Sequence, residues 1–395
     1  MPSDDSTPVH ARSPDGPARP TLGSAALDPD VDTAKAVERA LDLYLEQRLR
    51  EAEALDPRFA DDVASRVRTF ALRGGKRLRA QFVWWGWRAG GGDAAGTGWQ
   101  SALRLGAALE LIQTCALIHD DVMDGSSLRR GAPSLHVDFA EDHERSGLRG
   151  DHAAHGRASA ILAGDLALAW ADDLISDVDC SPSVRKRIHT LWRSMRAEMV
   201  AGQYLDMYAQ ADSSSSPDQA LRIALLKTSL YTVERPLELG AVLAGADEAT
   251  ISPLCSAGRS AGVAFQLRDD LLGVFGDPSA TGKPAGEDIR SGKLTYLTAV
   301  ARSLTEATGD ASAQRLLNQA LGNAAMSQAD LDGLCELLER TGARGMTEAE
   351  IDRLLRRSEE ELLRADLPSA VQNRLSALMS IPTKPVRTLA TPGTG

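Results

Sequence analysis

Apolar residues recur at intervals of three and four along most of this chain, and this spacing constrains the fold more than any other feature. It is clear in residues 34–54 and extends furthest in residues 98–124. Such spacing puts apolar side chains on one face of an α-helix, where they can pack against other helices. The same pattern predicts further helices at about 157–180, 183–211, 217–245, 250–275, 291–306, 311–322, 327–341, 347–364 and 367–379. No convincing alternation of apolar and polar residues is present, so we expect an all-α fold, a single-domain helical bundle with a deep central cavity.

Short segments rich in Gly, Ser, Asp and Pro separate these helices, at 73–75, 89–98, 212–218 and 276–286. Residues 141–157 are polar and contain glycine, so we expect a surface loop there. His152 and His155 lie in this segment. We expect both to be solvated and not metal ligands, because no carboxylate or cysteine stands at matching helical spacing.

The two ends of the chain differ from the region between them. Residues 1–30 and 381–395 are rich in Pro, Gly, Ser and Thr, and residues 1–30 lack the apolar core of a signal peptide. We therefore expect two disordered tails around a catalytic domain at 31–380. No uninterrupted apolar run is long enough to cross a membrane, so neither membrane insertion nor a location outside the cytoplasm is expected.

Charge argues against a nucleic-acid-binding protein, and cysteine content argues against a disulfide or zinc framework. The formal net charge of -11 argues against a nucleic-acid partner, because no basic excess is available to neutralise phosphates. The four cysteines are far apart in sequence and form no CxxC pair, as in reduced intracellular proteins: Cys115, Cys180, Cys255 and Cys335. Any anionic ligand must therefore be held by local clusters of Lys and Arg.

Three aspartates stand at the end of the apolar stretch 98–124. In a helix, Asp120 and Asp124 lie on one face about 6 Å apart, and Asp121 lies roughly 100° round from Asp120. A solvated acidic helix end is the simpler interpretation. Negative charge at a helix C-terminus opposes the macrodipole, however, so this placement calls for a compensating cation.

A second acidic pair, Asp269 and Asp270, is embedded among Leu and Val residues in another predicted helix. Two apolar helices that each carry an Asp-Asp pair are suited to bind Mg²⁺ across a shared cavity, because Mg²⁺ takes oxygen ligands and often bridges carboxylates and phosphates. Candidate phosphate-binding cations follow both motifs or begin other helices: Arg129, Arg130, Lys227, Lys283 and Lys293.

The segment "RGGKRLR" supplies Lys76, Arg77 and Arg79 directly after two glycines. A solvated charged face is the usual explanation of such a run. Because apolar residues follow and the glycines let the backbone approach a ligand closely, we favour an anion-binding cup at a helix start.

These segments together resemble the trans-isoprenyl diphosphate synthases (the polyprenyl synthetase family), and most closely the bacterial geranylgeranyl diphosphate synthases. The resemblance covers roughly residues 35–380 and rests on "GGKRLR", "DDVMD", "LRRGAPSLH", "KTSLY", "FQLRDDLLGVFGD" and "TGKPAGEDIRSGKLTY" in that order. It implies an all-α fold of the isoprenoid synthase type, three Mg²⁺ ions and usually a homodimer. It also implies condensation of isopentenyl diphosphate with allylic diphosphates.

The resemblance also implies roles for individual residues. The metal ligands would be Asp120, Asp121, Asp124, Asp269 and Asp270. The isopentenyl diphosphate subsite would comprise Lys76, Arg79 and Arg130, and the allylic subsite would comprise Arg129, Lys227, Thr228, Gln266 and Lys283. The residues expected to stabilise the departing diphosphate, and so to be catalytic, are Asp120, Asp124, Arg129, Lys227 and Asp269.

The chain departs from the family pattern at two positions. Gly273 stands where the second acidic motif usually ends in a third Asp, so we weight Asp269 above Asp270 as a ligand. Gln113 stands where many members have a His in the isopentenyl subsite; its amide can still donate to a phosphate oxygen. We expect His119, beside Asp120, to be structural.

Product length would depend on the residues before Asp120, where family members that make fifteen-carbon products usually carry an aromatic residue. Here Cys115 and Ala116 are small, which predicts a deeper pocket and a geranylgeranyl product. Leu111 and Ile112, or the tryptophans at 84, 85 and 87, could form the pocket floor, and the tryptophans could equally be ordinary core residues.

Several alternatives remain open at this point. The product could instead be farnesyl diphosphate or a chain of twenty-five carbons or more. The chain could also be a class I terpene cyclase, which would carry an Asn/Asp–Ser/Thr–Glu metal motif and would not need the cup. A non-catalytic subunit of a heteromeric synthase would typically lose metal ligands or cup residues.

Overall fold

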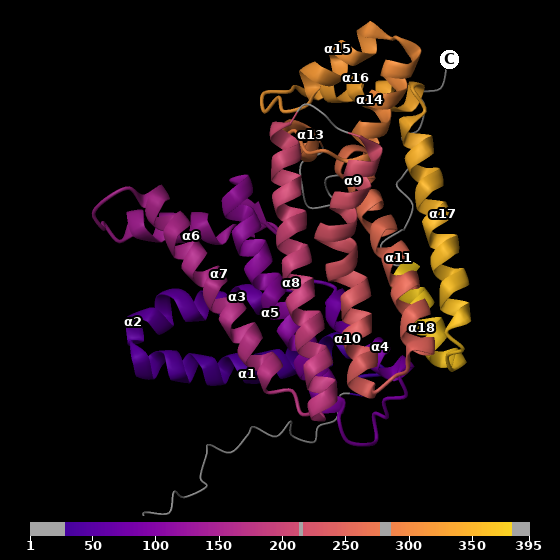
Figure 1. The fold of residues 1–395 in the computed structure, drawn as a ribbon. Coiled ribbons are helices and arrows are strands. Elements are labelled where there is room, and N and C mark those ends of the chain that lie inside the picture. The colour runs from indigo at the N-terminus through magenta and orange to yellow at the C-terminus, as the bar shows by residue number, and fades with distance from the viewer. Residues whose placement is uncertain (1–27, 213–215, 277–285, 381–395) are drawn as a thin grey trace, which may run out of the picture.

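The computed structural model describes residues 28–212, 216–276 and 286–380, and this part of the chain is almost entirely helical (Figure 1). The helices are α1 (Thr33–Leu55), α2 (Pro57–Phe59), α3 (Ser65–Leu72), α4 (Leu78–Ala89), α5 (Trp99–Asp124), α6 (Leu135–Arg145), α7 (His152–Ser176), α8 (Pro182–Ala211), α9 (Pro217–Ile223), α10 (Arg235–Ala244), α11 (Glu248–Phe275), α13 (Glu287–Arg290), α14 (Tyr296–Thr308), α15 (Ala311–Ala320), α16 (Gln328–Arg340), α17 (Ala343–Arg364) and α18 (Ser369–Ser380), with two π-helical segments, η1 (Ala60–Ala64) and η2 (Ala224–Glu234). The all-α prediction is confirmed.

One small hairpin interrupts the helices. Strands β1 (Leu128–Arg129) and β2 (Ala132–Pro133) pair antiparallel between α5 and α6. Arg130 and Gly131 form the turn with φ of 53° and 72°, the two positive values that a tight two-residue hairpin turn requires. The hairpin turns the chain back directly after the first acidic motif.

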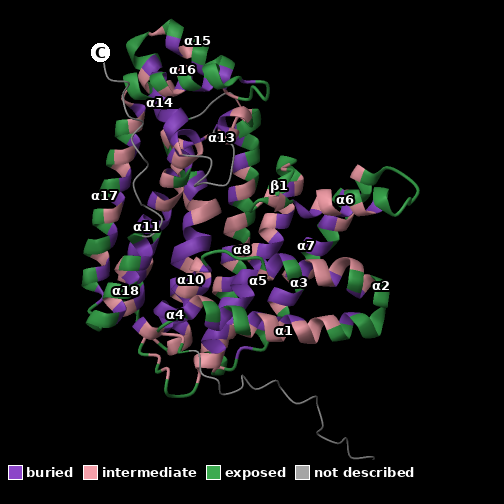
Figure 2. Ribbon diagram, turned by 180° about the vertical axis from the view of Figure 1, so that it is seen from behind, coloured by how far each residue is buried: buried purple, intermediate pink, exposed green. Residues whose placement is uncertain are grey.

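Helix α5 is the interior helix of the bundle. Most of its residues are buried (purple in Figure 2), and it packs against α7, α4 and α1. By length and composition α5 could cross a membrane, but 78% of its most apolar 18-residue window is buried within the protein. Its hydropathy is therefore explained by its central position.

Two apolar cores are joined by α11. Residues Ile251–Ala261 of α11 belong to the first core, which also contains α4 and α5. Residues Val263–Phe275 belong to the second core, with α14, α15, α16 and α17. In Figure 1, α14, α15 and α16 lie at the end of the bundle to which the acidic end of α11 points.

The prediction of a surface loop at 141–157 is right only for residues 146–151, which are exposed and connect two helices. Helix α6 extends to Arg145, and α7 begins at His152, where the Asp151 carboxylate accepts hydrogen bonds from the backbone N–H groups of Ala153 and Ala154. The imidazole of His155 packs against that of His143, with ring centroids 4.5 Å apart. Both helix ends expose polar residues, which gives them the composition of a loop.

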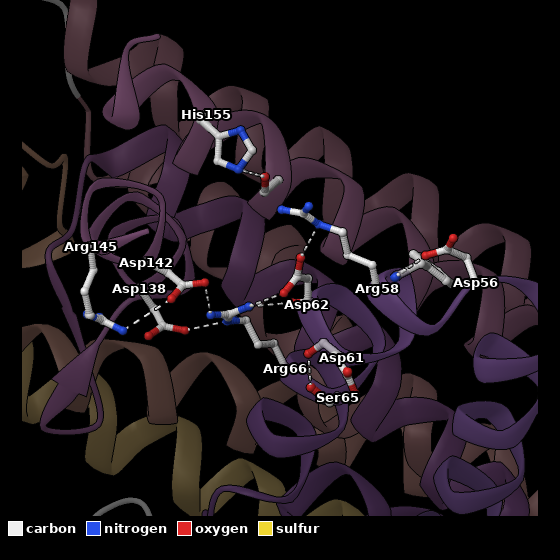
Figure 3. Close-up of polar contacts among 12 residues, drawn as sticks. Asp56, Arg58, Asp61, Asp62, Ser65, Arg66, Asp138, Asp142, Arg145 and His155 are labelled. Atoms are coloured by element: carbon white, nitrogen blue, oxygen red, sulfur yellow. Dashed lines mark hydrogen bonds and ion pairs between the residues drawn. The ribbon is translucent and has the colours of Figure 1, made fainter. Parts of the chain in front are cut away.

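Arg66 of α3 attaches the N-terminal helices to α6 (Figure 3). Its Nε donates to Asp138 Oδ2 at 2.9 Å and its Nη2 donates to Asp142 Oδ2 at 3.0 Å. The same guanidinium lies 4.8 Å from the ring centroid of Phe139. Three residues of one helix therefore hold a single arginine, and α3 is fixed on α6.

Helices α4 and α10 cross in backbone contact. A Cβ on Gly86 would collide with the backbone of Leu237, and one on Gly240 would collide with the carbonyl of Val83. The tryptophans at 84, 85 and 87 lie beside this crossing in the first core, with exposures of 0%, 5% and 3%. The structure therefore places all three in core packing.

The predicted tails at 1–30 and 381–395 lie outside the described residues, except for the last three residues of the first. Asp30 accepts a hydrogen bond from Trp84 Nε1 at 2.8 Å and pairs with Arg88 at 3.2 Å. The chain is thus attached to α4 just before α1 begins.

Candidate active site

The two acidic motifs lie at ends of α5 and α11, and lysines from other elements bind the α5 carboxylates. Lys227 Nζ, on η2, lies 3.5 Å from Asp120 Oδ1 and 2.6 Å from Asp206 Oδ2 on α8. Lys293 Nζ, just after α13, lies 3.0 Å from Asp124 Oδ2 and 3.9 Å from Asp288 Oδ1. Each lysine thus links one carboxylate of the first motif to a carboxylate on another element.

The second motif faces the same cluster. Asp270 is 7% exposed and accepts a hydrogen bond from Gln266 Nε2 at 2.7 Å. Burial raises the pKa of Asp270 well above its usual range, and the charges of Asp288, Asp269 and Asp206 raise it further. These carboxylates therefore share one region, and their mutual repulsion must be offset by cations.

The cations and carboxylates of the cluster shift one another's pKa values. Burial would raise the pKa of Asp120, but Lys227, Lys293 and Arg129 outweigh burial and lower it. Burial would lower the pKa of Lys293, but Asp124 and Asp288 outweigh burial and raise it. Asp120 and Lys293 are therefore both held in the charged form by partners of opposite sign.

Asp121 has a different environment from Asp120 and Asp124. Its carboxylate is completely buried and accepts a hydrogen bond from Arg129 Nε at 2.8 Å and a second from Arg129 Nη2. The same guanidinium donates to Asp120 Oδ2 at 3.2 Å. Arg129 therefore joins two neighbouring carboxylates. Of these two, Asp120 also pairs with a lysine, Lys227.

Helix η2 is widened into a π-helix where it carries Lys227 and Thr228, and such widening is frequent at functional sites. Thr228 Oγ1 donates to Gln266 Oε1 at 2.5 Å, which fixes this amide against η2. A Cβ on Gly202 of α8 would collide with the backbone of Lys227, and one on Gly262 of α11 would collide with Ser229. Two glycines therefore let α8 and α11 clamp η2 on both sides.

A second polar region, the cation cup, forms where α4 begins and comprises Arg77, Arg79 and Arg130 with the two glycines before Lys76. Arg130 Nη1 donates to the carbonyls of Arg73 and Gly74 at 2.6 Å and 2.9 Å. Its guanidinium lies where a Cβ on Gly75 would approach to 3.1 Å. A side chain at Gly75 would therefore displace this arginine.

The arginines of the cup face one another. Burial lowers the pKa of Arg130, and the charge of Arg77 lowers it further. Arg77 is buried and pairs with Glu110 at 2.8 Å. Within the described residues, the buried Nε atoms of Arg77 and Arg79 have no hydrogen-bond partner. A region with excess positive charge and unused N–H donors is suited to bind an anion.

The predicted substrate residues Arg79 and Gln113 meet at Tyr231. The guanidinium of Arg79 stacks on the Tyr231 ring at 4.3 Å and donates to Thr232 Oγ1 at 2.8 Å. The Tyr231 hydroxyl donates to Gln113 Oε1 at 2.9 Å. With its oxygen occupied in this way, the amide of Gln113 has its NH₂ group available as a donor. Lys76 is exposed, two residues before α4 begins.

Sequence reasoning missed two residues of the cluster, Gln203 and Asp206 of α8. Gln203 Nε2 donates to Asp120 Oδ1 at 3.1 Å. The two residues stand three apart, on one helix face, and Asp206 is buried. Polar residues at that spacing in a helix whose buried face is otherwise apolar were the signal available in the sequence. Among the predicted residues, Lys283 lies outside the described part of the chain.

His119 is held by α7. Its Nε2 lies 3.1 Å from the Ile161 carbonyl oxygen, its Nδ1 lies 3.7 Å from Cys115 Sγ, and its ring occupies the space beside Gly164. These contacts agree with the structural role expected for it.

Another acidic group, at Glu234, Glu238 and Cys255, has ligand atoms close enough together to hold a metal ion. Arginines already occupy it: Arg259 bonds Glu234 at 2.7 Å and Arg235 bonds Glu238 at 2.6 Å. Burial also raises the pKa of the Cys255 thiol, so the sulfur is protonated at neutral pH. We interpret this group as an ion-pair network.

The main cluster does fit Mg²⁺. Its possible ligand atoms are carboxylate oxygens from α5, α8, α11 and α13, and the lysines between them supply the positive charge that a metal could share. An all-α bundle with such a cluster and a separate cation cup defines the class of metal-dependent enzymes that act on diphosphates.

The chain matches the polyprenyl synthetase family over residues 62–338, and it belongs to that family. It is 30% identical over 359 residues to a (2E,6E)-farnesyl diphosphate synthase of Mycobacterium bovis, covering 87% of this chain and 92% of the relative. It is 34% identical over 275 residues to a geranylgeranyl diphosphate synthase of Mycobacterium tuberculosis, covering 69% and 71%.

A solved structure has the same fold. The geranylgeranyl pyrophosphate synthase of Corynebacterium glutamicum, complexed with isoprenyl diphosphate and magnesium, matches with a TM-score of 0.84 and 37% identity over 91% of this chain and 99% of that one. The protein is therefore a trans-prenyl diphosphate synthase, a prenyltransferase of a family that uses isopentenyl and allylic diphosphates and depends on Mg²⁺. The terpene cyclase alternative is thereby excluded.

Proposed function

We propose that this synthase makes geranylgeranyl diphosphate. The observation that carries the proposal is the face of α5 that leads away from the metal cluster. Gln113, Ala116 and Asp120 follow one another on this face at intervals of three and four and are all partly exposed, in a helix that is otherwise largely buried. Ala116 is the residue one turn before Asp120, and its methyl group leaves room for a chain longer than fifteen carbons.

The two polar regions fit the two substrates. We assign the allylic diphosphate to the carboxylate cluster, with Arg129, Lys227, Thr228, Gln266 and Lys283 as its contacts. We assign isopentenyl diphosphate to the cation cup, with Lys76, Arg79, Arg130 and Gln113. Gln113 is next to the cup, because it accepts a hydrogen bond from Tyr231, on which Arg79 stacks.

Metal ions, three as in the resemblance, would neutralise the allylic diphosphate and would be held by Asp120, Asp124, Asp269 and Asp270. We keep Asp121 as a weaker candidate, because its carboxylate is engaged by Arg129. Lys227 and Arg129 add positive charge where the leaving group departs.

The reaction then needs no protein nucleophile. The allylic C–O bond breaks with both electrons going to diphosphate, and the double bond of isopentenyl diphosphate attacks the resulting carbocation. Loss of a proton to the released diphosphate completes the condensation. The protein's contribution is to orient the two substrates and to stabilise the departing charge.

We propose that the buried part of α5 forms the pocket floor. Leu111 and Ile112 are fully buried. Cys115 is also buried, and its thiol contacts His119 on the side of α7. We therefore weight Ala116 above Cys115 as the residue that limits product length.

We also propose a homodimer. Apolar side chains are exposed on α7 and α8, and such a surface is unusual for a monomer: Ile161 (46%), Leu162 (63%), Val200 (62%), Tyr204 (64%), Met207 (42%) and Tyr208 (53%). Sedimentation of the wild type and of Leu162→Asp/Tyr204→Asp tests it; a wild type that sediments as a monomer contradicts it.

We further propose one catalytic domain at 31–380 and a cytoplasmic location.

The test of the product is direct. Purified protein is incubated with Mg²⁺, isopentenyl diphosphate and dimethylallyl, geranyl or farnesyl diphosphate in turn, and products are measured by mass. We expect twenty carbons with every primer. A product of fifteen carbons would favour the farnesyl alternative, to which the mycobacterial relative points, and twenty-five or more would favour a longer-chain synthase. No condensation at all would favour the non-catalytic subunit, although the retained cluster and cup argue against it.

A further inference from the structure

A groove outside the candidate active site is formed by α9, η2, α11 and α17. Helix α11 packs against both η2 and α17 (Figure 1), and the groove has a volume of about 330 Å³, within the range of small-molecule sites. Leu225 of η2 lines the groove, whereas Lys227 pairs with Asp120. Side chains two residues apart on a helix do not share a face, so the groove and the active site lie on different sides of η2.

The base of the groove is apolar. Val263 of α11 and Leu354 of α17 belong to the second core, with exposures of 8% and 7%. Leu221 and Leu225 pack against the same core and are half-buried. The second core therefore reaches the surface here, and a hydrocarbon chain lying on it would be removed from water, which is favourable.

Arginines dominate the rim of the groove. Four of its lining residues are arginines and one, Glu350, is an acid, although the formal net charge of the chain is -11. Two of these arginines have partners within the protein: Arg259 pairs with Glu234 at 2.7 Å, and Arg353 pairs with Glu350 at 2.6 Å. The positive charge that remains comes from the other two.

These two are Arg222 of α9 and Arg357 of α17, on two different walls of the groove. Both are exposed, and neither makes an ion pair or a hydrogen bond with the described residues. The fork of N–H donors on a guanidinium matches the oxygens of a phosphate group. Ser256 and Ser260 of α11 add hydroxyl groups to the lining. The rim is therefore suited to bind an anionic head group.

We propose that this groove, which we name the arginine groove, is a second binding site for a prenyl diphosphate, with the hydrocarbon chain on the apolar base and the diphosphate between Arg222 and Arg357. Charge and apolar surface together favour a single-chain anion. An α-helix occupies roughly 800 Å³ over two turns, so the groove is too small to enclose a partner helix. The inference needs only the prenyltransferase activity of the family and holds for any product length.

The measurement is ligand binding without turnover. Radiolabelled farnesyl diphosphate is dialysed to equilibrium against the full-length protein in EDTA, where no metal can link diphosphate to the carboxylate cluster. Arg222→Ala/Arg357→Ala should bind it about tenfold or more weakly, because charged hydrogen-bond donors are lost. Arg356→Ala removes an exposed arginine of α17 that does not line the groove, and it should bind as the wild type does. Circular dichroism checks that both variants keep the helical fold.

Two further arms locate the ligand and test the apolar base. Farnesyl diphosphate should slow hydrogen–deuterium exchange in residues 217–226 and 350–357 of the wild type, and should not do so in Arg222→Ala/Arg357→Ala. Inorganic diphosphate lacks the hydrocarbon chain, so its binding to the groove should be at least tenfold weaker.

Four results would overturn the inference. If the double variant binds farnesyl diphosphate as the wild type does, or if exchange slows only at the start of α4, the ligand binds in the candidate active site alone. Absence of any binding to the wild type in EDTA contradicts the proposal directly. Equal binding of inorganic diphosphate would mean that the apolar base takes no part. If phosphatidylglycerol vesicles bind the wild type and not the double variant, while farnesyl diphosphate binds neither, the groove contacts a membrane surface instead.

Discussion

The carboxylate cluster meets α5 at Asp120 and Asp124, the cation cup meets it at Glu110, and the two regions balance their charges differently. In the cluster, Asp120 and Asp124 each have a lysine within 3.5 Å, so both signs of charge come from the protein. In the cup, no ion pair joins Arg79 or Arg130 to a carboxylate of the described residues, and only Arg77 pairs with acids, Glu110 at 2.8 Å and Glu38 at 3.5 Å.

The difference indicates what each region must do. The cluster can fold with its charge neutralised and then exchange contacts with lysine for contacts with metal and diphosphate. The cup holds an excess of positive charge at a cost in stability, and binding an anion relieves that cost. Removing a carboxylate should therefore mainly lower kcat, whereas removing a cup arginine should mainly raise the KM for the substrate that the cup binds.

The largest effect is expected from the cluster. Asp120→Ala or Asp124→Ala should lower kcat by about a thousandfold or more, because stabilisation of the leaving group is the largest contribution to this kind of catalysis. Steady-state kinetics at saturating Mg²⁺ measure it. Asp165→Ala, which removes an exposed carboxylate of α7, is the control, and near-normal turnover in Asp120→Ala would refute the assignment.

The cup should respond through the Michaelis constant. Arg130→Ala and Lys76→Ala should raise KM for isopentenyl diphosphate by about ten- to a hundredfold, the value of a charged hydrogen bond, with little change for the allylic primer. Lys283→Ala should do the reverse. Equal effects on both substrates in all three variants would show that the two regions do not divide the substrates.

Much of this architecture was predictable because it depends on local patterns. The spacing of apolar residues located α5, α8 and α11 to within two residues, and the paired aspartates pointed to a shared cluster. The loop predicted at 141–157 was too long because α6 is short and α7 begins with exposed polar residues. The buried face of α6, at Leu135, Phe139 and His143, has the four-residue spacing that could have identified it.

The site was harder to predict where contacts are long-range. Nothing local to residue 288 indicates that it fills the space beside Gly273, since this follows from how α13 returns to α11. Likewise, Gln113 and Tyr231 are 118 positions apart, and only the packing of η2 on α5 brings them together. Sequence patterns identify residue types and helix faces, and tertiary packing decides which of them meet.

Product length tests the α5 face that leads away from the metal cluster. Ala116→Phe should shift the product from twenty carbons to fifteen, because each isoprene unit needs about one helical turn of length, ~5.4 Å. Cys115→Phe should shift it less and destabilise the fold more, by about 1–3 kcal/mol, because its side chain is packed against His119. Mass spectrometry of products and thermal melting measure both. A folded Ala116→Phe that still releases the wild-type product would mean that the chain does not follow this face.

The smallest effect concerns the cluster without metal, where Asp270 is the carboxyl least compensated by cations. Burial, with Asp288, Asp269 and Asp206 nearby, raises its pKa in the folded protein above that of the unfolded chain. The folded state therefore binds the proton more tightly, and stability falls as pH rises from the unfolded pKa through the folded one. In EDTA, Asp270→Asn should gain stability relative to wild type as pH increases from 4 to 8, measured by urea unfolding at each pH. Asp218→Asn, on the exposed start of α9, should show no such trend. A pH-independent difference for Asp270→Asn would mean that cations neutralise Asp270 as fully as they do Asp120.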